Sequence, residues 1–191
     1  MIMREIIIQD NIKWYLVPKT GTRSILHILR MNTSAVLKQK EESETDYVFS
    51  FSIVRNPWER LLSTWKDKIQ TQWSDKFPEK SRRWRIHAFK QYKDKGFGFF
   101  VKNVITSSNE HVELQSNLID LNNIDFIGRF ENLQQDFDII CDKIGILRQE
   151  LSHKNKTNHE HYTEYYNDET REIVAEKYAK DIEYFNYKFG K

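Results

Sequence analysis

The sequence has one cysteine, three prolines and six glycines among its 191 residues. A single cysteine excludes an internal disulfide framework and any zinc site that needs several thiolates. So few glycines and prolines exclude collagen-like and linker-like compositions. No segment approaches the roughly 18 consecutive apolar residues of a membrane-spanning helix, and Ile6–Ile8 is too short for the apolar core of a signal peptide. We therefore expect a soluble, cytoplasmic protein with no integral membrane segment.

The composition is that of a folded domain with a highly charged surface. Hydrophobic residues make up 39% of the chain, aromatic residues 14% and charged residues 30%. This composition and length predict one domain over residues 1–191. The net charge of +2 argues against a generic nucleic-acid-binding protein. No feature of the sequence indicates the oligomeric state.

Charge is distributed unevenly along the chain. The span Lys76–Lys95 holds eight basic and two acidic residues, whereas Glu160–Glu183 holds eight acidic and three basic residues. The basic span could bind an anionic partner or could be an ordinary solvated surface. A non-catalytic module that binds polyanions through Lys76–Lys95 is therefore one alternative function.

Several short segments have the composition of strands. Arg4–Gln9 and Lys13–Val17 flank a turn signal at Asp10-Asn11, and Asp125–Gly128 is predicted as a further buried strand. Tyr47–Val54 is nearly all apolar or small, which is typical of a strand covered on both faces. The polar stretch Asn32–Asp46 is expected to be a connection.

Helices are predicted where apolar residues repeat every three or four positions. The first covers Thr22–Arg30, the second begins at Pro57 with Asn56 as its N-cap, and the last runs from about Asp168 into the 180s. Thr71–Ser108 is expected to be helical in pieces. The helix that begins at Pro57 has the apolar stripe Trp58, Leu61, Leu62, Trp65 and Ile69. A third helix is predicted from the stripe Phe130, Leu133, Phe137, Ile140, Cys141 and Ile144. Cys141 is therefore predicted to be a core residue rather than a reactive thiol.

The order of these elements predicts an α/β domain with a central, mainly parallel sheet flanked by helices. Ligands of such sheets bind at the carboxyl ends of the strands. The first informative strand end is Val17–Ser24, where an apolar strand enters a turn and then a helix. Backbone N–H groups of the turn and helix start, three hydroxyls and Lys19 would form an anion cradle there. The spacing is not that of the nucleoside-triphosphate loop.

The second informative strand end is Arg55, which follows the buried strand. Ser63 lies seven residues after the cap residue Asn56, nearly two helical turns, and so shares its helix face. Arg55 and Ser63 can then converge on one anion, with the guanidinium as a fork and the hydroxyl as a donor. Two such strand ends predict a ligand with two separated phosphate-like groups.

These residues resemble a known family. Lys19–Ser24 resembles the 5′-phosphosulfate loop of sulfotransferases, and Arg55 with Ser63 resembles their 3′-phosphate motif. The resemblance covers residues 12–188 and implies the P-loop-NTPase-like sulfotransferase fold. Resemblance to the carbohydrate branch of the family lies in His111–Gln115, Asp125–Leu133 and Tyr162–Tyr187.

The resemblance implies transfer of a sulfuryl group from 3′-phosphoadenosine 5′-phosphosulfate (PAPS) to a hydroxyl or amine of an acceptor, expected to be a carbohydrate, without a metal ion. It implies that Lys19 is catalytic and stabilises the charge on the oxygen that bridges sulfur and the 5′-phosphate. The donor-binding residues that it implies are Lys19, Thr20, Gly21, Thr22, Arg23, Ser24, Arg55 and Ser63.

The acceptor needs a general base, for which the resemblance suggests His111. The interval Asn32–Asp46 has no histidine, although the glycosaminoglycan 2-O branch carries its base between the two motifs. A carboxylate there remains an alternative: Glu41, Glu42, Glu44 or Asp46. Many cytosolic sulfotransferases close the far side of the 3′-phosphate with an Arg-Lys-Gly loop, which this sequence lacks. Lys154 and Lys156 could supply the positive charge instead.

A nucleotide or small-molecule kinase is a further alternative function. The triphosphate loop and Mg²⁺ ligands that a kinase needs are not seen in the sequence.

Overall fold

The structure is a computed structural model that describes residues 4–9, 11–33, 36–39, 47–71, 89–92, 94–107, 109–151 and 160–191. The chain divides into two compact units. We call Met1–Arg55 with Gln115–Asn158 the sheet unit, and Asn56–Leu114 with His159–Lys191 the helical unit. That residues 1–191 form one domain stays a prediction.

The sheet unit contains a five-stranded sheet in the order β3-β1-β2-β4-β5. Its strands are β1 (Arg4–Ile8), β2 (Ile12–Tyr15), β3 (Val36–Gln39), β4 (Phe49–Val54) and β5 (Phe126–Arg129). β2, β4 and β5 are parallel neighbours, whereas β1 pairs antiparallel with β2 and with β3. The carboxyl ends of the three parallel strands therefore meet at one edge of the sheet. The predicted α/β class is confirmed.

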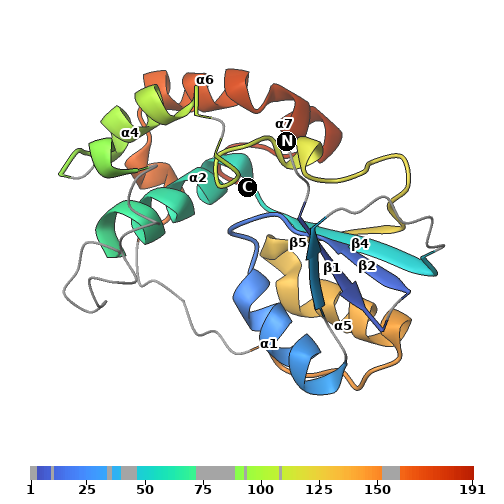
Figure 1. The fold of residues 1–191 in the computed structure, drawn as a ribbon. Coiled ribbons are helices and arrows are strands. Elements are labelled where there is room, and N and C mark those ends of the chain that lie inside the picture. The colour runs from blue at the N-terminus through green and yellow to red at the C-terminus, as the bar shows by residue number, and fades with distance from the viewer. Residues whose placement is uncertain are drawn as a thin grey trace. The chain divides into compact units, whose positions relative to one another are not determined.

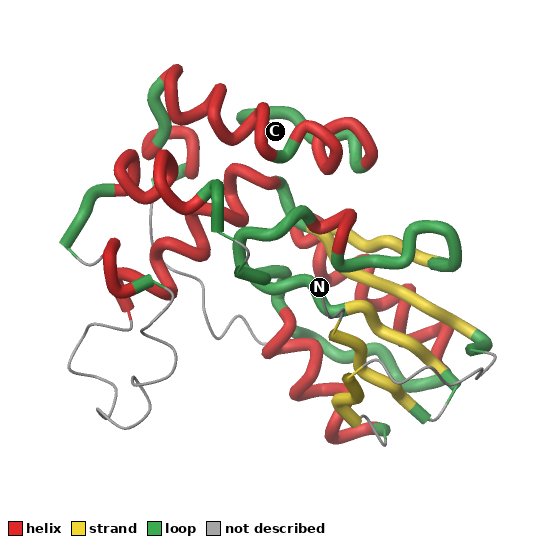
Figure 2. The backbone as a smooth tube through the Cα atoms, turned by 45° about the horizontal axis from the view of Figure 1, so that its top comes forward, coloured by secondary structure: helices red, strands yellow, loops and turns green. Residues whose placement is uncertain are grey.

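Helices α1 (Thr22–Asn32) and α5 (Leu133–Ile144) cover one face of this sheet (Figures 1 and 2). Alternate residues of β1, β2 and β4 point toward them, so Phe49, Phe51 and Ile53 of β4 join one buried cluster with both helices. Cys141 is fully buried in this cluster, and its prediction as a core residue is confirmed.

Two element predictions differ from the structure. The predicted connection Asn32–Asp46 contains strand β3, which pairs with β1 and which the polar composition of the surrounding stretch did not indicate. The last predicted helix is two helices, α6 (Asp168–Lys177) and α7 (Ala179–Tyr184), which meet at Tyr178.

The sheet unit also contains two short 3₁₀ turns. One of them, η4 (Phe130–Asn132), precedes α5. A second, η3 (Gln115–Asn117), begins the other segment of the sheet unit.

The helical unit is built around α2 (Pro57–Trp65), which continues as the π-helical turn η1 (Lys66–Thr71). The predicted N-cap is confirmed, because the Asn56 side chain accepts a hydrogen bond from the N–H of Trp58. The other elements are η2 (Lys90–Tyr92), α4 (Phe97–Val104), η5 (Tyr162–Tyr165), α6 and α7. Their apolar faces pack into an aromatic-rich core that includes Trp58, Trp65, Phe97, Phe100, Tyr162 and Tyr178.

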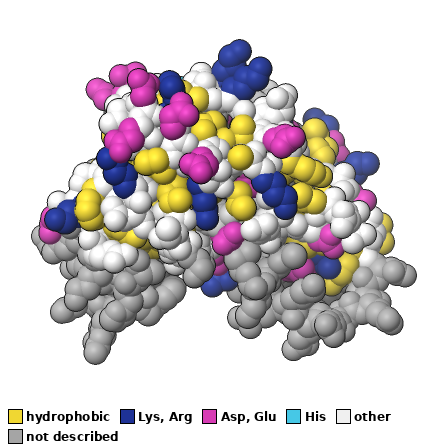
Figure 3. Space-filling view, turned by 90° about the horizontal axis from the view of Figure 1, so that it is seen from above, with side chains coloured by type: hydrophobic (Ala, Val, Ile, Leu, Met, Phe, Trp, Pro, Cys, Tyr) yellow, Lys and Arg dark blue, Asp and Glu magenta, His cyan; other side chains and the backbone are white. Residues whose placement is uncertain are grey.

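Charged side chains of both signs lie on the surface that α6 lines (Figure 3). Lys102 pairs with Glu169 at 2.6 Å, and Arg171 pairs with Asp168 at 3.3 Å. Most of the basic span Lys76–Lys95 lies outside the described residues. Among the residues that are described, no helix is long and apolar enough to cross a membrane.

Candidate functional site

The turn between β2 and α1 has an unusual backbone. Lys19 has a φ of 77° and Gly21 a φ of 78°, so both are left-handed. This conformation costs a non-glycine residue about 1–2 kcal/mol. Sharp turns of this kind can present successive N–H groups to an anion. The backbone of this turn is therefore compatible with binding an anion.

Gly21 lies close to the side chain of Leu133 at the start of α5. A Cβ atom at this position would lie 2.6 Å from Leu133 Cδ2. Gly21 is also the N-cap of α1 and has no side chain with which to cap the helix. Because first-turn N–H groups have no partner within a helix, an uncapped start is a favourable place for a phosphate or sulfate.

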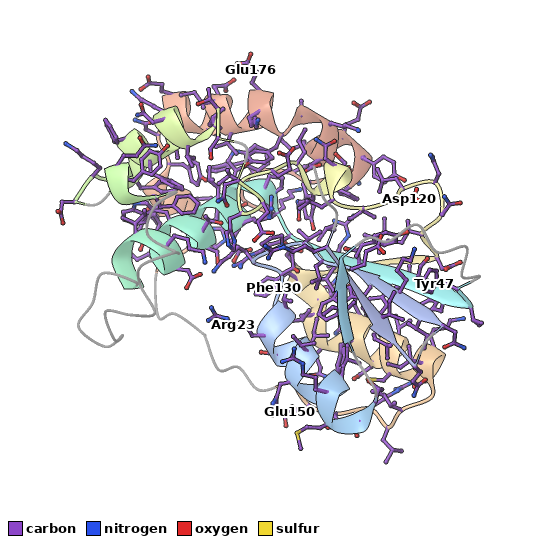
Figure 4. The ribbon with its side chains drawn as sticks, in the orientation of Figure 1. Arg23, Tyr47, Asp120, Phe130, Glu150 and Glu176 are labelled. Carbon is purple, nitrogen blue, oxygen red and sulfur yellow. The ribbon has the colours of Figure 1, made fainter. Side chains whose placement is uncertain are left out.

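The hydroxyl groups of this turn face the end of β2. The Oγ1 atoms of Thr20 and Thr22 both donate to the carbonyl oxygen of Val17, at 2.8 and 3.3 Å. Thr20 is buried, so its contact with a ligand is expected through the backbone N–H rather than the hydroxyl. Arg23 is exposed and projects from the first turn of α1 (Figure 4).

Arg55 brings the two predicted strand ends together. Its Nη1 donates to the carbonyl oxygen of Lys19 at 3.0 Å. Its guanidinium carbon lies 3.9 Å from the centroid of the Phe130 ring, whose edge is also close to Gly21. Only 7% of Arg55 is exposed. A guanidinium can bind phosphate oxygens as a fork, so this position beside the turn suits an anion.

The sequence did not indicate the role of Gln115 in holding Arg55. Gln115 Oε1 accepts from the N–H of Arg55 at 2.9 Å, and Gln115 Nε2 donates to the Arg55 carbonyl at 2.8 Å. Gln115 is fully buried. The resemblance of His111–Gln115 to the carbohydrate branch was the only sequence signal that included Gln115.

Ser63 and His111 belong to the helical unit. Ser63 is half-buried on α2, which is continuous from Pro57, so its predicted face is that of Asn56. Convergence of Ser63 with Arg55, and of His111 with Lys19, stays a prediction. The alternative bases Glu41, Glu42, Glu44 and Asp46, together with Lys154 and Lys156, lie outside the described residues.

The backbone around His111 is held by buried side chains. Arg60, 1% exposed, donates from Nη1 to the carbonyl of Glu113 at 2.7 Å and from Nη2 to that of Glu110 at 3.0 Å. The carbonyl oxygens of His111 and Val112, which lie between Glu110 and Glu113, also accept hydrogen bonds. The His111 carbonyl accepts from the Thr64 hydroxyl at 3.1 Å, and the Val112 carbonyl accepts from the Tyr178 hydroxyl at 2.7 Å. Burial raises the pKa of Tyr178, which keeps its phenol protonated as a donor.

A sequence model of the sulfotransferase family matches residues 6–188, nearly the whole chain. The chain belongs to the sulfotransferase family. Membership identifies a transferase that moves sulfuryl groups, and it agrees with the α/β sheet. No curated protein and no solved structure gives a significant match.

The residues of the sheet unit fit the phosphosulfate donor that this family generally uses. An uncapped helix start, a glycine turn and a buried arginine provide N–H groups and positive charge, which are the donors that phosphate oxygens need. Within the described residues, no group of three or more His, Cys, Asp or Glu side chains is placed to hold a metal ion.

Proposed function

We propose that this sulfotransferase moves a sulfuryl group from PAPS to a hydroxyl or amine of an acceptor, with a carbohydrate as the acceptor class. The observation that carries the donor assignment is the contact between Arg55 and the Lys19 carbonyl at the uncapped start of α1. The contact places the guanidinium of Arg55 beside the turn that carries Lys19, which supports binding of an anionic nucleotide donor there.

Each residue of the turn has a role in this proposal. Backbone N–H groups from Thr20 to Arg23 bind the 5′-phosphosulfate, with the hydroxyl of Ser24 as a further donor because its N–H already bonds the Gly21 carbonyl. Arg23 adds positive charge at the exposed side. Arg55 and Ser63 bind the 3′-phosphate. Lys19 directs its ammonium at the bridging oxygen and stabilises the charge that develops there as the sulfur–oxygen bond breaks.

His111 is proposed to take the proton from the acceptor hydroxyl. Its backbone is fixed by hydrogen bonds to Arg60, Thr64 and Tyr178 on neighbouring carbonyls, which suits a group that must be held in place. A carboxylate of residues 41–46 remains the alternative base. A single domain over residues 1–191 and a cytoplasmic location remain part of this proposal.

A thermal-shift screen tests the donor assignment, because a ligand that binds only the native state raises its melting temperature. We expect adenosine 3′,5′-bisphosphate to stabilise the protein and AMP, ADP and ATP to do so much less. Stabilisation by Mg²⁺-ATP alone would instead support a kinase. Salt-sensitive binding of random DNA in a gel shift, without affinity for the bisphosphate, would support the polyanion-binding module.

A further inference from the structure

The amide side chain of Gln115 pairs with the backbone of Arg55 as a neighbouring strand would. Strand β4 ends at Val54, and Arg55 is the first residue beyond it. Both backbone polar groups of Arg55 are used by Gln115, the N–H at 2.9 Å and the carbonyl at 2.8 Å. Gln115 comes from η3, 60 residues later in the chain, and is fully buried.

This pairing has a consequence for the Arg55 side chain. With its N–H and carbonyl both held, the backbone of Arg55 has little freedom to rotate, so the direction of its Cα–Cβ bond is set. The guanidinium then reaches the Lys19 carbonyl and the Phe130 ring. Gln115, Arg55 and Lys19 thus form a continuous series of contacts within the sheet unit.

We propose that Gln115 is a positioning residue for donor binding: its two-point contact with Arg55 holds the guanidinium where it supports the Lys19 turn and meets a donor phosphate. The proposal rests on the proposed function, because it assigns Gln115 a role in the same site. Gln115 itself does not touch the donor.

The test replaces Gln115 with methionine, which has similar length and no hydrogen-bonding amide. We expect Gln115→Met to lower the affinity for adenosine 3′,5′-bisphosphate about tenfold in calorimetry, since a lost pair of buried hydrogen bonds frees Arg55. In an Arg55→Ala background, the same substitution should change the affinity no further. That double-mutant cycle separates action through Arg55 from a general loss of stability.

Gln134 offers a matched control in the same unit. Its side chain also holds backbone groups: Oε1 accepts from the N–H of Leu151 at 2.8 Å, and Nε2 donates to the Gln149 carbonyl at 3.1 Å. Gln134→Met should lower the melting temperature but leave bisphosphate affinity unchanged. An equal loss of affinity in both variants would overturn the positioning role.

Failure of this inference and failure of the proposed function are distinguishable. If the wild-type protein binds the bisphosphate and Gln115→Met binds it equally well, the positioning role is wrong and the proposed function stands. If the wild-type protein does not bind it, the donor assignment itself is wrong.

A second variant and a second measurement apply if Gln115→Met does not fold. Gln115→Glu retains the oxygen that accepts from the Arg55 N–H. Hydrogen exchange of the Arg55 amide in the wild-type protein tests that contact directly. Protection of that amide is expected, and rapid exchange would contradict the proposal.

Discussion

The guanidinium of Arg55 donates a hydrogen bond to the carbonyl oxygen of Lys19 at 3.0 Å. Lys19 lies in the turn after β2, Arg55 directly follows the neighbouring parallel strand β4, and the two are 36 positions apart in the chain. Lys19 has a left-handed backbone, which is unfavourable for a lysine. The hydrogen bond therefore links the residue proposed to bind the 3′-phosphate to the conformation of the residue proposed to act at sulfur.

Substitution of Arg55 is expected to affect both binding and turnover. Arg55→Ala should weaken adenosine 3′,5′-bisphosphate binding, as loss of a charge-assisted contact does, and should also lower turnover at saturating donor because the Lys19 turn loses its support. Arg55→Lys keeps the charge but not the fork, so it should rescue little. Calorimetry and a radiolabelled sulfate-transfer assay measure the two effects. Unchanged affinity in Arg55→Ala would refute the role in binding.

The charge of Lys19 and its backbone can be separated by two substitutions. Lys19→Ala and Lys19→Gly should both lower turnover by about 10²–10³, since each removes the cation proposed to stabilise the transition state. Lys19→Gly should be more stable than Lys19→Ala by about 1 kcal/mol, because glycine adopts the left-handed conformation without strain. Denaturant unfolding and the transfer assay measure these quantities. Near-normal turnover of either variant would remove Lys19 from the mechanism.

Gly21 and Gly145 form a matched pair for testing the turn. Both have positive φ, 78° and 73°, but a Cβ at Gly145 would meet nothing within 4 Å. Gly145→Ala should therefore cost only the backbone strain, about 1–2 kcal/mol of unfolding free energy. Gly21→Ala should cost about 1 kcal/mol more, the low end of overpacking penalties, because the end of the Leu133 side chain must move. Equal losses in the two variants would show that packing against α5 does not constrain the turn.

The carbonyls around His111 can be tested without changing His111 itself. Tyr178→Phe removes the hydrogen bond to the Val112 carbonyl and is expected to lower turnover more than it lowers affinity for adenosine 3′,5′-bisphosphate. Tyr184 is 52% exposed, so Tyr184→Phe serves as the control and should change neither. Unaltered turnover in Tyr178→Phe would argue that the position of this segment does not limit the reaction, and would favour a base elsewhere.

Cys141 provides a test of burial through pH. Burial raises the pKa of its thiol from 9.0 to about 11. The unfolded chain therefore loses this proton first, and the contribution of Cys141 to stability should fall as pH rises from about 9 to 11. Cys141→Ala should show a smaller decline in unfolding free energy over that window. The native thiol should also resist a thiol reagent at pH 8, and rapid labelling there would contradict the buried position.

The sequence predicted what depends on local pattern. The apolar stripes placed α1, α2 and α5, and the Asn56-Pro57 pair identified the start of α2, because these features are set by neighbouring residues. Strand β3 was missed because it is only four residues long within a polar and charged stretch, and its pairing with β1 is made by backbone groups. The contacts of Arg55 with Lys19 and with Gln115 join residues 36 and 60 positions apart, so no local pattern encodes them.

A crystal structure of the protein with adenosine 3′,5′-bisphosphate tests the central claim most directly. We predict that the 5′-phosphate lies against the backbone N–H groups at the start of α1, within reach of the Lys19 ammonium, and that the guanidinium of Arg55 contacts the 3′-phosphate. A nucleotide bound away from both Lys19 and Arg55, or a start of α1 closed to the phosphate by side chains, would contradict the assignment.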